Sequence, residues 1–461
     1  MTGRPGLSFC LFCANLLATT LEHTLQDSSM KKIAKKLILW ILKILAKKRL
    51  NKFRGKVIAV VGSIGKTSTK EAIFTVLNSQ FKVRKNKGNM NNEFGFLLSI
   101  LEINSGYSSA TKWTWYLIKA FVHSLMRDHS EILLLELGVD KPGDMDFLIS
   151  ILKLDMVVFT SIAPVHMDEG QFESMEAVLH EKLKATKALR EKGVAIFNVD
   201  NNFLQDSYHK FDRKQRVSFG LSEEADFWAS NIENSIDGIK FILHVGHGGS
   251  DNEKRYEVHA NVIGQYQAYV LLPALACGLK LGMEPEQAIL ALERYSLPPG
   301  RMNKIEGIGE SVILDSSYNS SPNALKEALK VLNEVTGEKG RRIAVLGNMN
   351  ELGERSKEMH EMIGKMIPEV CDILLTVGKE AELIAEKAVE RGMDPNVIFK
   401  FKTAQDAADF FKKEVKKGDV ILVKGSQNRV RLEKFVKELM LRPEDAKDLL
   451  VRQGREWEAK M

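Results

Sequence analysis

VIAVVGSIGKTS, residues 57–68, decides the fold of this chain. Its apolar, β-branched first half predicts a buried strand, and residues 69–79 have the pattern of a helix. Between them, glycines let backbone N–H groups approach phosphate oxygens, and the helix N-terminus favours their charge. Lys66 is then placed to offset phosphate charge and Thr67 to ligate magnesium. Val60 stands where the full phosphate-loop signature has its first glycine, so a simple glycine-rich turn is the alternative.

Short apolar runs alternate with longer amphipathic stretches on both sides of this loop. The runs are residues 57–61, 132–137, 156–160, 194–197, 312–315, 343–346, 373–377 and 420–423. Such alternation predicts βαβ units, a mostly parallel sheet and an α/β fold. Residues 225–260 instead predict inserted strands or a hairpin, and residues 266–294 predict helices. Pro298-Pro299-Gly300 predicts a linker between two α/β domains.

The resulting division of the chain has four parts. We expect a leader with a basic helix at 1–54, a central ATP-binding domain at 55–297, a second α/β domain at 298–440 and a polar tail at 441–461. The chain has 461 residues, of which 44% are hydrophobic and 27% are charged. This length and composition are typical of a soluble enzyme with sizeable cores.

The net charge and the cysteines narrow the class of protein and its cellular compartment further. The net charge of +6 comes from 66 basic and 60 acidic residues, with much of the excess between 31 and 56. A nucleic-acid-binding protein would carry its basic residues through the folded domain, so we expect no such partner. Four scattered cysteines, Cys10, Cys13, Cys277 and Cys371, fit a reducing, cytoplasmic location.

Residues 31–53 predict a basic amphipathic helix. Its lysines gather on one face, and its longest uncharged run, 37–42, is far shorter than the roughly 20 apolar residues of a spanning helix. Two interpretations stay open: weak, salt-reversible attachment to an anionic membrane surface, or a helix packed on the next domain with a solvated lysine face. The preceding residues 1–29 make a poor signal peptide, and Met30 is a candidate translation start.

Further motifs follow the phosphate loop in a fixed order. They are GNMNNEFG (88–95), ELG (136–138), PGDM (142–145), TSI (160–162) with His166, EKLK (181–184), GR (300–301), DSSYN (315–319) with Pro322, GNMNELG (347–353), His360 and KGS (424–426). Together with the phosphate loop, and over about residues 55–435, this set resembles the Mur ligase family.

The resemblance implies a fold and an activity. It implies a central P-loop ATPase domain with a mostly parallel sheet and a C-terminal Rossmann-like α/β domain. It also implies an ATP-dependent ligase that forms an amide through an acyl phosphate. The asparagine-rich loop at 88–95 resembles the branch that adds D-alanyl-D-alanine to a UDP-N-acetylmuramoyl tripeptide in peptidoglycan synthesis. Small-molecule substrates and a monomer are then expected.

The same resemblance assigns roles to individual residues. Lys66, His166, Lys182 and Arg301 are the expected catalytic residues. ATP is expected to contact Gly62, Ser63, Gly65, Lys66, Thr67, Ser68, Gln267, Arg301 and Asp315. Thr67 and Glu136 would ligate one magnesium ion, and His166 with a carbamylated Lys182 a second; manganese suits the same ligands. The expected substrate contacts are Asn91, Asn92, Glu93, Tyr318 and Asn319.

Two departures from the family pattern stand out. Tyr266-Gln267 replaces the His-Asn pair that commonly contacts adenine in the family, although a ring and an amide edge remain. Only 61 residues precede Gly62, too few for a full UDP-binding first domain.

Two other functions compete with this hypothesis. One is a related ligase for another acid and amino acid, of the folylpolyglutamate or cyanophycin type. The other is a non-catalytic nucleotide-binding scaffold at a membrane surface. The joint presence of Lys66, Thr67, Glu136, His166, Lys182 and Arg301 argues against the scaffold, because a binding module has no need of two metal sites.

Overall fold

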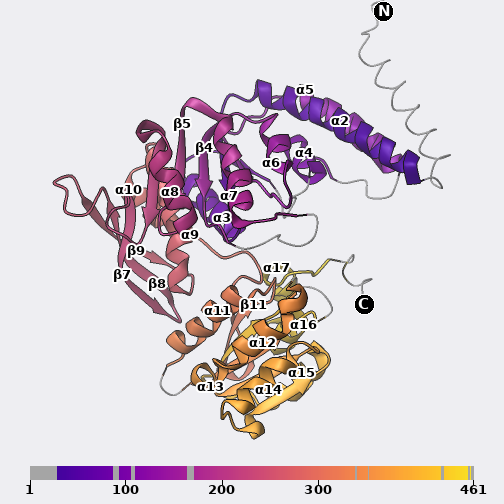
Figure 1. Cartoon of the computed structure of the whole chain (residues 1–461), viewed down its shortest axis with the longest axis vertical. Coiled ribbons are helices and arrows are strands. Elements are labelled where there is room, and N and C mark those ends of the chain that lie inside the picture. Colours follow the sequence, from indigo (N-terminus) through magenta and orange to yellow (C-terminus); the bar gives the residue numbers. More distant parts are fainter. Residues whose placement is uncertain are drawn as a thin grey trace, which may run out of the picture. The chain divides into compact units, whose positions relative to one another are not determined.

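The computed structural model describes residues 28–86, 93–104, 110–163, 171–337, 340–350, 352–426, 430–454 and 457. The chain forms two compact units. The first comprises Met1–Trp228, Gly246–Asn252 and Leu272–Glu284, and the second Ala229–Val245, Glu253–Leu271 and Pro285–Met461. Both contain strands and helices, which confirms the predicted α/β class (Figure 1). The boundaries of the four expected parts stay predictions.

The first unit is built around a parallel sheet. Its strands are β1 (Lys56–Val61), β2 (Val83–Lys85), β3 (Ile132–Glu136), β4 (Leu154–Phe159), β5 (Leu189–Asn198) and β6 (Arg216–Gly220). They are ordered β2-β3-β1-β4-β5-β6, and the sheet continues into β7 (Phe227–Ser235), β8 (Gly238–Val245) and β9 (Lys254–Ala260). Every residue of β3 and all but the first of β1 are buried, which explains their unbroken apolar runs. Because β1 lies between β3 and β4, its carboxyl end is a point where the strand order switches direction, where such sheets bind ligands.

Several helices belong to this unit. They are α2 (Ser28–Lys52), α3 (Lys66–Leu77), α4 (Glu93–Leu101), α5 (Ala110–Leu125), α6 (Asp144–Ile149), α7 (Met175–Leu183) and α8 (Asn202–Lys210), with 3₁₀ turns η1 (Lys184–Ala188) and η2 (Arg213–Gln215). α2 packs on α4 and α5, and Ile38, Leu42 and Ala46 on its inner face join the core. One face of 31–53 is therefore packed on the unit, as the packed-helix interpretation expects, and attachment to a membrane surface stays a prediction. None of the described helices has the length and apolar character needed to cross a membrane.

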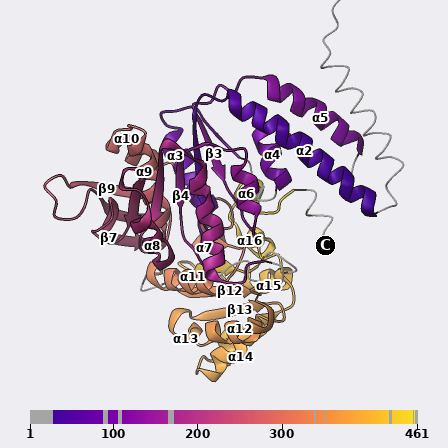
Figure 2. The ribbon, with the colours of Figure 1, turned by 45° about the horizontal axis from the view of Figure 1, so that its top comes forward.

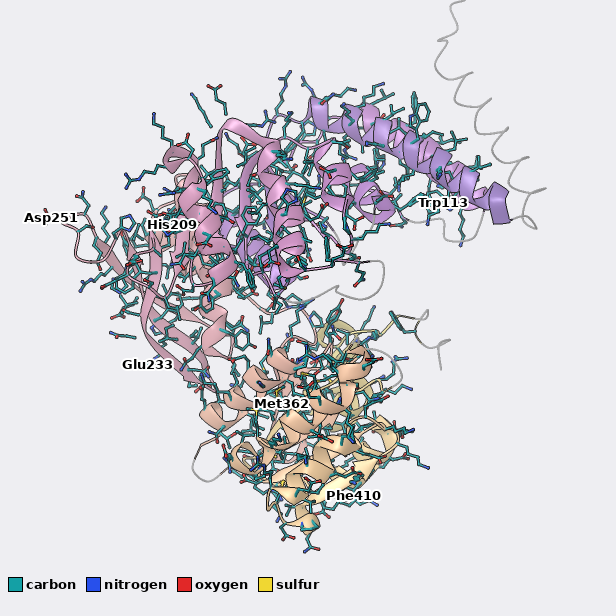
Figure 3. The ribbon with its side chains drawn as sticks, viewed as in Figure 1. Trp113, His209, Glu233, Asp251, Met362 and Phe410 are labelled. Carbon is teal, nitrogen blue, oxygen red and sulfur yellow. The ribbon has the colours of Figure 1, made fainter. Side chains whose placement is uncertain are left out.

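An antiparallel segment and a helical segment follow, as the sequence predicts for 225–260 and 266–294. The strands are β7 (Phe227–Ser235), β8 (Gly238–Val245) and β9 (Lys254–Ala260), and the helical elements are η3 (Gln265–Gln267), α9 (Ala268–Lys280) and α10 (Pro285–Leu292). β8 and β9 pair from Ile239 to Val245, and Asp251 in the loop that joins them is labelled in Figure 3.

The second unit contains the predicted Rossmann-like sheet. Its order is β10-β11-β15-β12-β13-β14, parallel except for the β10–β11 pair. The strands are β10 (Asn303–Glu306), β11 (Val312–Ser316), β12 (Arg342–Gly347), β13 (Ile373–Val377), β14 (Ile398–Phe401) and β15 (Val420–Lys424). The sequence runs 312–315, 343–346, 373–377 and 420–423 thus correspond to β11, β12, β13 and β15.

Helices complete this unit (Figure 2). They are α11 (Pro322–Val335), α12 (Ser356–Gly364), α13 (Ile367–Val370), α14 (Glu382–Glu390), α15 (Ala404–Phe411), α16 (Glu433–Leu439) and α17 (Ala446–Leu449), with turns η4 (Ile308–Glu310), η5 (Gly353–Arg355), η6 (Pro395–Val397) and η7 (Pro443–Asp445). Ala446 and Leu450 are buried in its core. These two residues of the predicted polar tail are therefore packed in the unit, whereas 441–444 and 447–449 are exposed.

Candidate active site

The glycine loop is held at the carboxyl ends of β1 and β4. A Cβ atom at position 62 would lie 2.0 Å from Thr160 Oγ1, so only glycine fits there. The Thr160 hydroxyl donates to the Ile64 carbonyl at 2.7 Å, which fixes the loop against β4. Gly65 has φ +83° and caps the start of α3, a left-handed conformation that favours glycine. The sequence expectation of a strand, a loop and a helix is therefore confirmed.

Lys66 is the first residue of α3. Its half-buried side chain turns back over the loop, and Nζ donates to the Ser63 carbonyl at 3.2 Å. The first N–H groups of a helix have no partner within the helix and carry its positive dipole end. The ammonium of Lys66 adds to that positive charge, which is the arrangement that binds a polyphosphate. The predicted phosphate contacts Gly62, Ser63, Gly65, Lys66, Thr67 and Ser68 lie together in this one turn.

Glu136 is the last residue of β3 and is only 2% exposed. Its Oε1 accepts a hydrogen bond of 3.1 Å from Thr67 Oγ1. Its Oε2 is buried and accepts no hydrogen bond from any described residue. A hydroxyl oxygen beside a carboxylate oxygen with unused acceptor capacity suits magnesium, which prefers oxygen ligands. Thr67 and Glu136 therefore fit the first predicted metal site.

Two residues that sequence reasoning missed hold Glu136 in place. Lys70 is 1% exposed, and its Nζ lies 3.5 Å from Glu136 Oε2 and donates to the Asn86 carbonyl at 3.3 Å. The Asn86 side chain accepts from Glu136 N at 3.0 Å and donates to Glu136 O at 3.5 Å. Burying a carboxylate is costly unless it is paired, and Lys70 supplies the opposite charge. Lys70 stands four residues after Lys66, and on a helix this spacing places two side chains on the same face. That spacing was the signal in the sequence that could have identified Lys70.

Lys182 is buried in α7 with 1% exposure. Burial, and secondarily the nearby Lys66 ammonium, lower the pKa of Lys182 to about 7. The preceding Glu181 anchors this part of α7, because its Oε1 accepts from Gly143 N at 3.0 Å and Met145 N at 2.9 Å at the start of α6. A carbamate forms only on a neutral amine, so the surroundings of Lys182 fit the predicted modification.

Lys184 has the opposite environment two residues later. Its Nζ pairs with Asp146 at 2.6 Å and with Glu181 at 2.7 Å. These hydrogen bonds, first to Asp146 and then to Glu181, raise the pKa of Lys184. The two lysines of the Glu181–Lys184 segment are therefore distinguished by structure, and Lys184 is a matched control for Lys182.

Some predicted residues cannot be placed. His166, Asn91 and Asn92 lie outside the described residues, whereas Glu93 is half-buried at the start of α4. The described part of the chain contains no group of three or more His, Cys, Asp or Glu that could hold a metal ion. The second metal site, with His166 and Lys182 as ligands, thus stays a prediction.

In the second unit, polar residues gather at the ends of β11 and β15. Asp315 is fully buried; its Oδ1 accepts from Ser317 N at 3.0 Å, and its Oδ2 has no hydrogen-bond partner among the described residues. Burial raises the pKa of Asp315 to about 6. On the neighbouring strand, Lys424 Nζ donates to Ser316 Oγ at 3.1 Å and to Asn319 O at 3.0 Å. The predicted residues Asp315 and Asn319 are thus brought together around Lys424.

Arg301 lies on the ring of Tyr318. The guanidinium carbon is 4.5 Å from the ring centroid, and Tyr318 N donates to the Gly300 carbonyl at 3.1 Å. Arg452, from the tail, donates to the Tyr318 carbonyl at 2.6 Å and pairs with the buried Glu433 at 2.8 Å. Sequence reasoning missed Arg452 and Glu433, since nothing local marks a buried ion pair between distant segments. Their effect is to hold the backbone that carries Tyr318.

Gln267 and Tyr266, which stand where the family commonly contacts adenine, have different surroundings. Gln267 is 1% exposed, and its Oε1 has no hydrogen-bond partner within the described ranges. That amide oxygen is an acceptor of the kind an adenine amino group requires. Tyr266 is half-buried, and burial raises the pKa of its phenol, so it stays neutral at physiological pH.

The loop that follows β12 is fixed by side chains. His360 is buried; its Nε2 accepts from Met349 N at 3.0 Å, and its Nδ1 lies 2.7 Å from the Ser356 carbonyl. This pattern requires the neutral tautomer with the proton on Nδ1, in agreement with a pKa of His360 lowered by burial. Ser426 Oγ joins the same loop to the residue that follows the DSSYN segment, accepting from Asn350 N at 2.9 Å and donating to Ser320 O at 3.0 Å. His360 is thus a structural residue.

Comparison with known proteins places these motifs in a family. The Mur ligase middle domain matches residues 60–278, and the Mur ligase glutamate ligase domain matches residues 300–427. The chain is 29% identical over 403 residues to the UDP-N-acetylmuramoyl-tripeptide–D-alanyl-D-alanine ligase of Bacillus subtilis, covering 87% of this chain and 79% of that one. It is 27% identical to the Escherichia coli enzyme of the same name over 332 residues, 72% of this chain and 66% of that one.

Solved structures give the same result. The MurF ligase of Thermotoga maritima in complex with ADP has a TM-score of 0.69 and 26% identity, covering 89% of this chain and 84% of that chain. A crystal structure of MurF from Acinetobacter baumannii has a TM-score of 0.73 at 24% identity, covering 88% of this chain and 81% of that chain. The second likeness concerns the fold alone.

Proposed function

The chain belongs to the Mur ligase family, and we propose that it joins D-alanyl-D-alanine to a UDP-N-acetylmuramoyl tripeptide, converting ATP to ADP and phosphate. The observation that carries this proposal is the phosphate loop. Lys66 and Thr67 open α3 at the carboxyl end of β1, and Thr67 is hydrogen-bonded to the buried Glu136. The relatives with this activity share the family and most of the chain length.

The chemistry explains the cationic loop. Amide formation from a carboxylate in water is uphill, so the acid is first phosphorylated to an acyl phosphate. In this phosphorylation a carboxylate must approach a triphosphate. The repulsion between the two anions has to be cancelled by fixed positive charge. Lys66 and the N-terminus of α3 supply that charge. Magnesium, when bound, supplies further charge neutralisation at the phosphates, and Thr67 and Glu136 would hold it.

We assign supporting roles to the remaining residues. Lys182, as a carbamate, would offer oxygen to a second magnesium, or to manganese, together with His166. Arg301 would contact the phosphates, Asp315 the ribose and Gln267 the adenine. Asn91, Asn92, Glu93, Tyr318 and Asn319 would contact the acid or the dipeptide. The enzyme would act as a monomer on small molecules in the cytoplasm, at or near the inner face of the membrane.

A panel of amine donors tests the proposal. Purified protein with ATP, magnesium and UDP-N-acetylmuramoyl tripeptide should release phosphate only when D-alanyl-D-alanine is added, with single amino acids giving background rates. Mass spectrometry of the product should show the tripeptide extended by the dipeptide. Faster release with glutamate or another single amino acid would reject D-alanyl-D-alanine and favour the related ligase for another substrate. Absence of release with every donor would favour the nucleotide-binding scaffold.

A further inference from the structure

The outer face of α2 carries an apolar stripe. Ile33, Leu37, Trp40 and Ile44 are spaced i, i+4, i+7 and i+11 and are 61%, 41%, 61% and 46% exposed. The inner face is opposite, because the side chains that join the core are Ile38, Leu42, Leu45 and Ala46. α2 therefore presents two apolar faces, of which the described structure covers one.

The helix α5 repeats the pattern. Trp115, Val122 and Met126 follow the spacing i, i+7 and i+11 and are 64%, 48% and 54% exposed, while Leu117 and Ala120 join the same core as α2. The two helices pack on each other and lie side by side in both ribbon views (Figures 1 and 2). Trp113 of α5, labelled in Figure 3, is only half-exposed and contacts Phe94 of α4, with ring centroids 6.0 Å apart. The tryptophan that faces outward is thus Trp115.

Exposed apolar side chains concentrate on this pair. Of the 14 large hydrophobic residues that are exposed among those described, eight belong to α2, α5 or the residue that follows α5: Ile33, Leu37, Trp40, Ile44, Trp115, Val122, Leu125 and Met126. Isolated exposed apolar residues are ordinary on soluble proteins, but their concentration on two helices that pack on each other points to an interaction surface. We call this set the α2–α5 stripe.

The charge that α2 and α5 themselves carry has a single sign. Neither α2 nor α5 contains an aspartate or a glutamate. Lys36 and Lys47 are exposed on α2, and Lys119 is exposed four residues after Trp115, within the stripe itself. Tryptophan and aliphatic side chains bordered by lysines are typical of helices that lie in the plane of a membrane interface.

We propose that α2 and α5 form one platform that docks on an anionic lipid surface. Trp40 and Trp115 would insert at the boundary of headgroups and acyl chains, and Lys36, Lys47 and Lys119 would contact lipid phosphates. A second copy of the chain is a poorer occupant, since a two-fold contact would bring like-charged lysines together. The platform goes beyond a charged helix, because its apolar stripe adds a component of binding that salt does not screen.

Vesicle binding of the full chain tests this inference. Flotation with phosphatidylglycerol–phosphatidylcholine vesicles should show binding that weakens but persists when salt is raised, and phosphatidylcholine alone should bind less. The variant Trp40→Ala/Trp115→Ala should lose the salt-resistant part, about tenfold or more in partition. Lys36→Gln/Lys47→Gln/Lys119→Gln should lose the salt-sensitive part. Matched controls are Leu290→Ala/Leu441→Ala and Lys402→Gln/Lys413→Gln, which alter exposed residues elsewhere and should bind like the parent.

Three outcomes would overturn the proposal. The tryptophan variant binding vesicles like the parent, with the same blue shift of fluorescence, would show that the stripe does not meet lipid. A parent chain that is dimeric in sedimentation, and that Trp40→Ala/Trp115→Ala makes monomeric, would assign the stripe to a second copy. If the parent chain does not bind anionic vesicles at low salt, the stripe does not bind lipid and is instead covered by another segment of this chain or by another protein. Circular dichroism and soluble-substrate turnover, expected to be unchanged in all variants, exclude misfolding and keep this test separate from the ligase proposal.

Discussion

Lys66→Ala should lower the rate of D-alanyl-D-alanine-dependent phosphate release by about a hundredfold or more, because removing one preorganised charge at a developing phosphoryl transition state has effects of that order. The folded state should hardly change. The Lys66 ammonium donates to a loop carbonyl, that of Ser63, and its side chain is half-buried. Turnover and circular dichroism measured on one sample test both parts.

A lysine at the start of the strand that precedes the glycine loop is the matched control. Lys56 begins β1, is exposed and pairs with Asp155 at 3.2 Å, so Lys56→Ala should keep the parent rate. The assignment of Lys66 fails if Lys66→Ala retains more than about a tenth of the rate, which is under about 1.4 kcal/mol of barrier. Equal losses in both variants would point to general damage to β1.

Lys182→Ala should also lower turnover strongly, and small carboxylates should restore part of it. If Lys182 carries a carbamate, alanine removes a metal-binding oxygen and leaves space where acetate can supply one. Without the modification, an ammonium beside the metal would repel it. We expect a higher magnesium requirement in the variant, measured as the magnesium concentration at half-maximal rate, and a rate that rises with acetate.

The contrast with Lys184 makes this prediction specific. Lys184→Ala removes a charged, ion-paired side chain and should neither raise the magnesium requirement nor respond to acetate. Loss of turnover in Lys184→Ala with acetate rescue, or a normal rate in Lys182→Ala, would show that the modified residue is misassigned.

The lowered pKa of Lys182 adds a dependence on pH. The neutral amine becomes the main form as pH rises through about 7, so bicarbonate should reactivate carbon-dioxide-depleted enzyme better at pH 8 than at pH 6. An unshifted lysine, with its pKa near 10.5, would remain almost wholly charged at both values. Equal reactivation at both would contradict a neutral amine in the folded protein.

The parts of the fold and site that the sequence could predict are those whose residues are neighbours in the chain. β1, the glycine loop and α3 are consecutive, so a strand pattern, two glycines and a helix pattern were sufficient. Even here the start of the helix was missed by three residues, since α3 begins at Lys66 and not at Thr69. The reason is that Gly65, in its left-handed conformation, already caps the helix, whereas sequence periodicity starts only where apolar residues recur.

Contacts between distant segments were beyond such reasoning. Lys70 and Asn86 secure Glu136 across 66 and 50 residues, and Arg452 reaches Tyr318 across 134. Such partners are brought together by the order of strands, which periodicity does not specify. The α2–α5 stripe was hidden for a related reason. A helix with two apolar faces shows a weak single-face pattern, so the sequence alone revealed only its lysines.

Transfer of labelled oxygen tests the central claim, ligation through an acyl phosphate, most directly. UDP-N-acetylmuramoyl tripeptide carrying ¹⁸O in its reacting carboxylate is incubated with ATP, magnesium and D-alanyl-D-alanine, and the phosphate is examined by mass spectrometry. We predict one ¹⁸O atom in each phosphate released, in step with amide formation, because the carboxylate oxygen that attacks ATP leaves with the phosphoryl group. Unlabelled phosphate, or label recovered in AMP, would contradict the account.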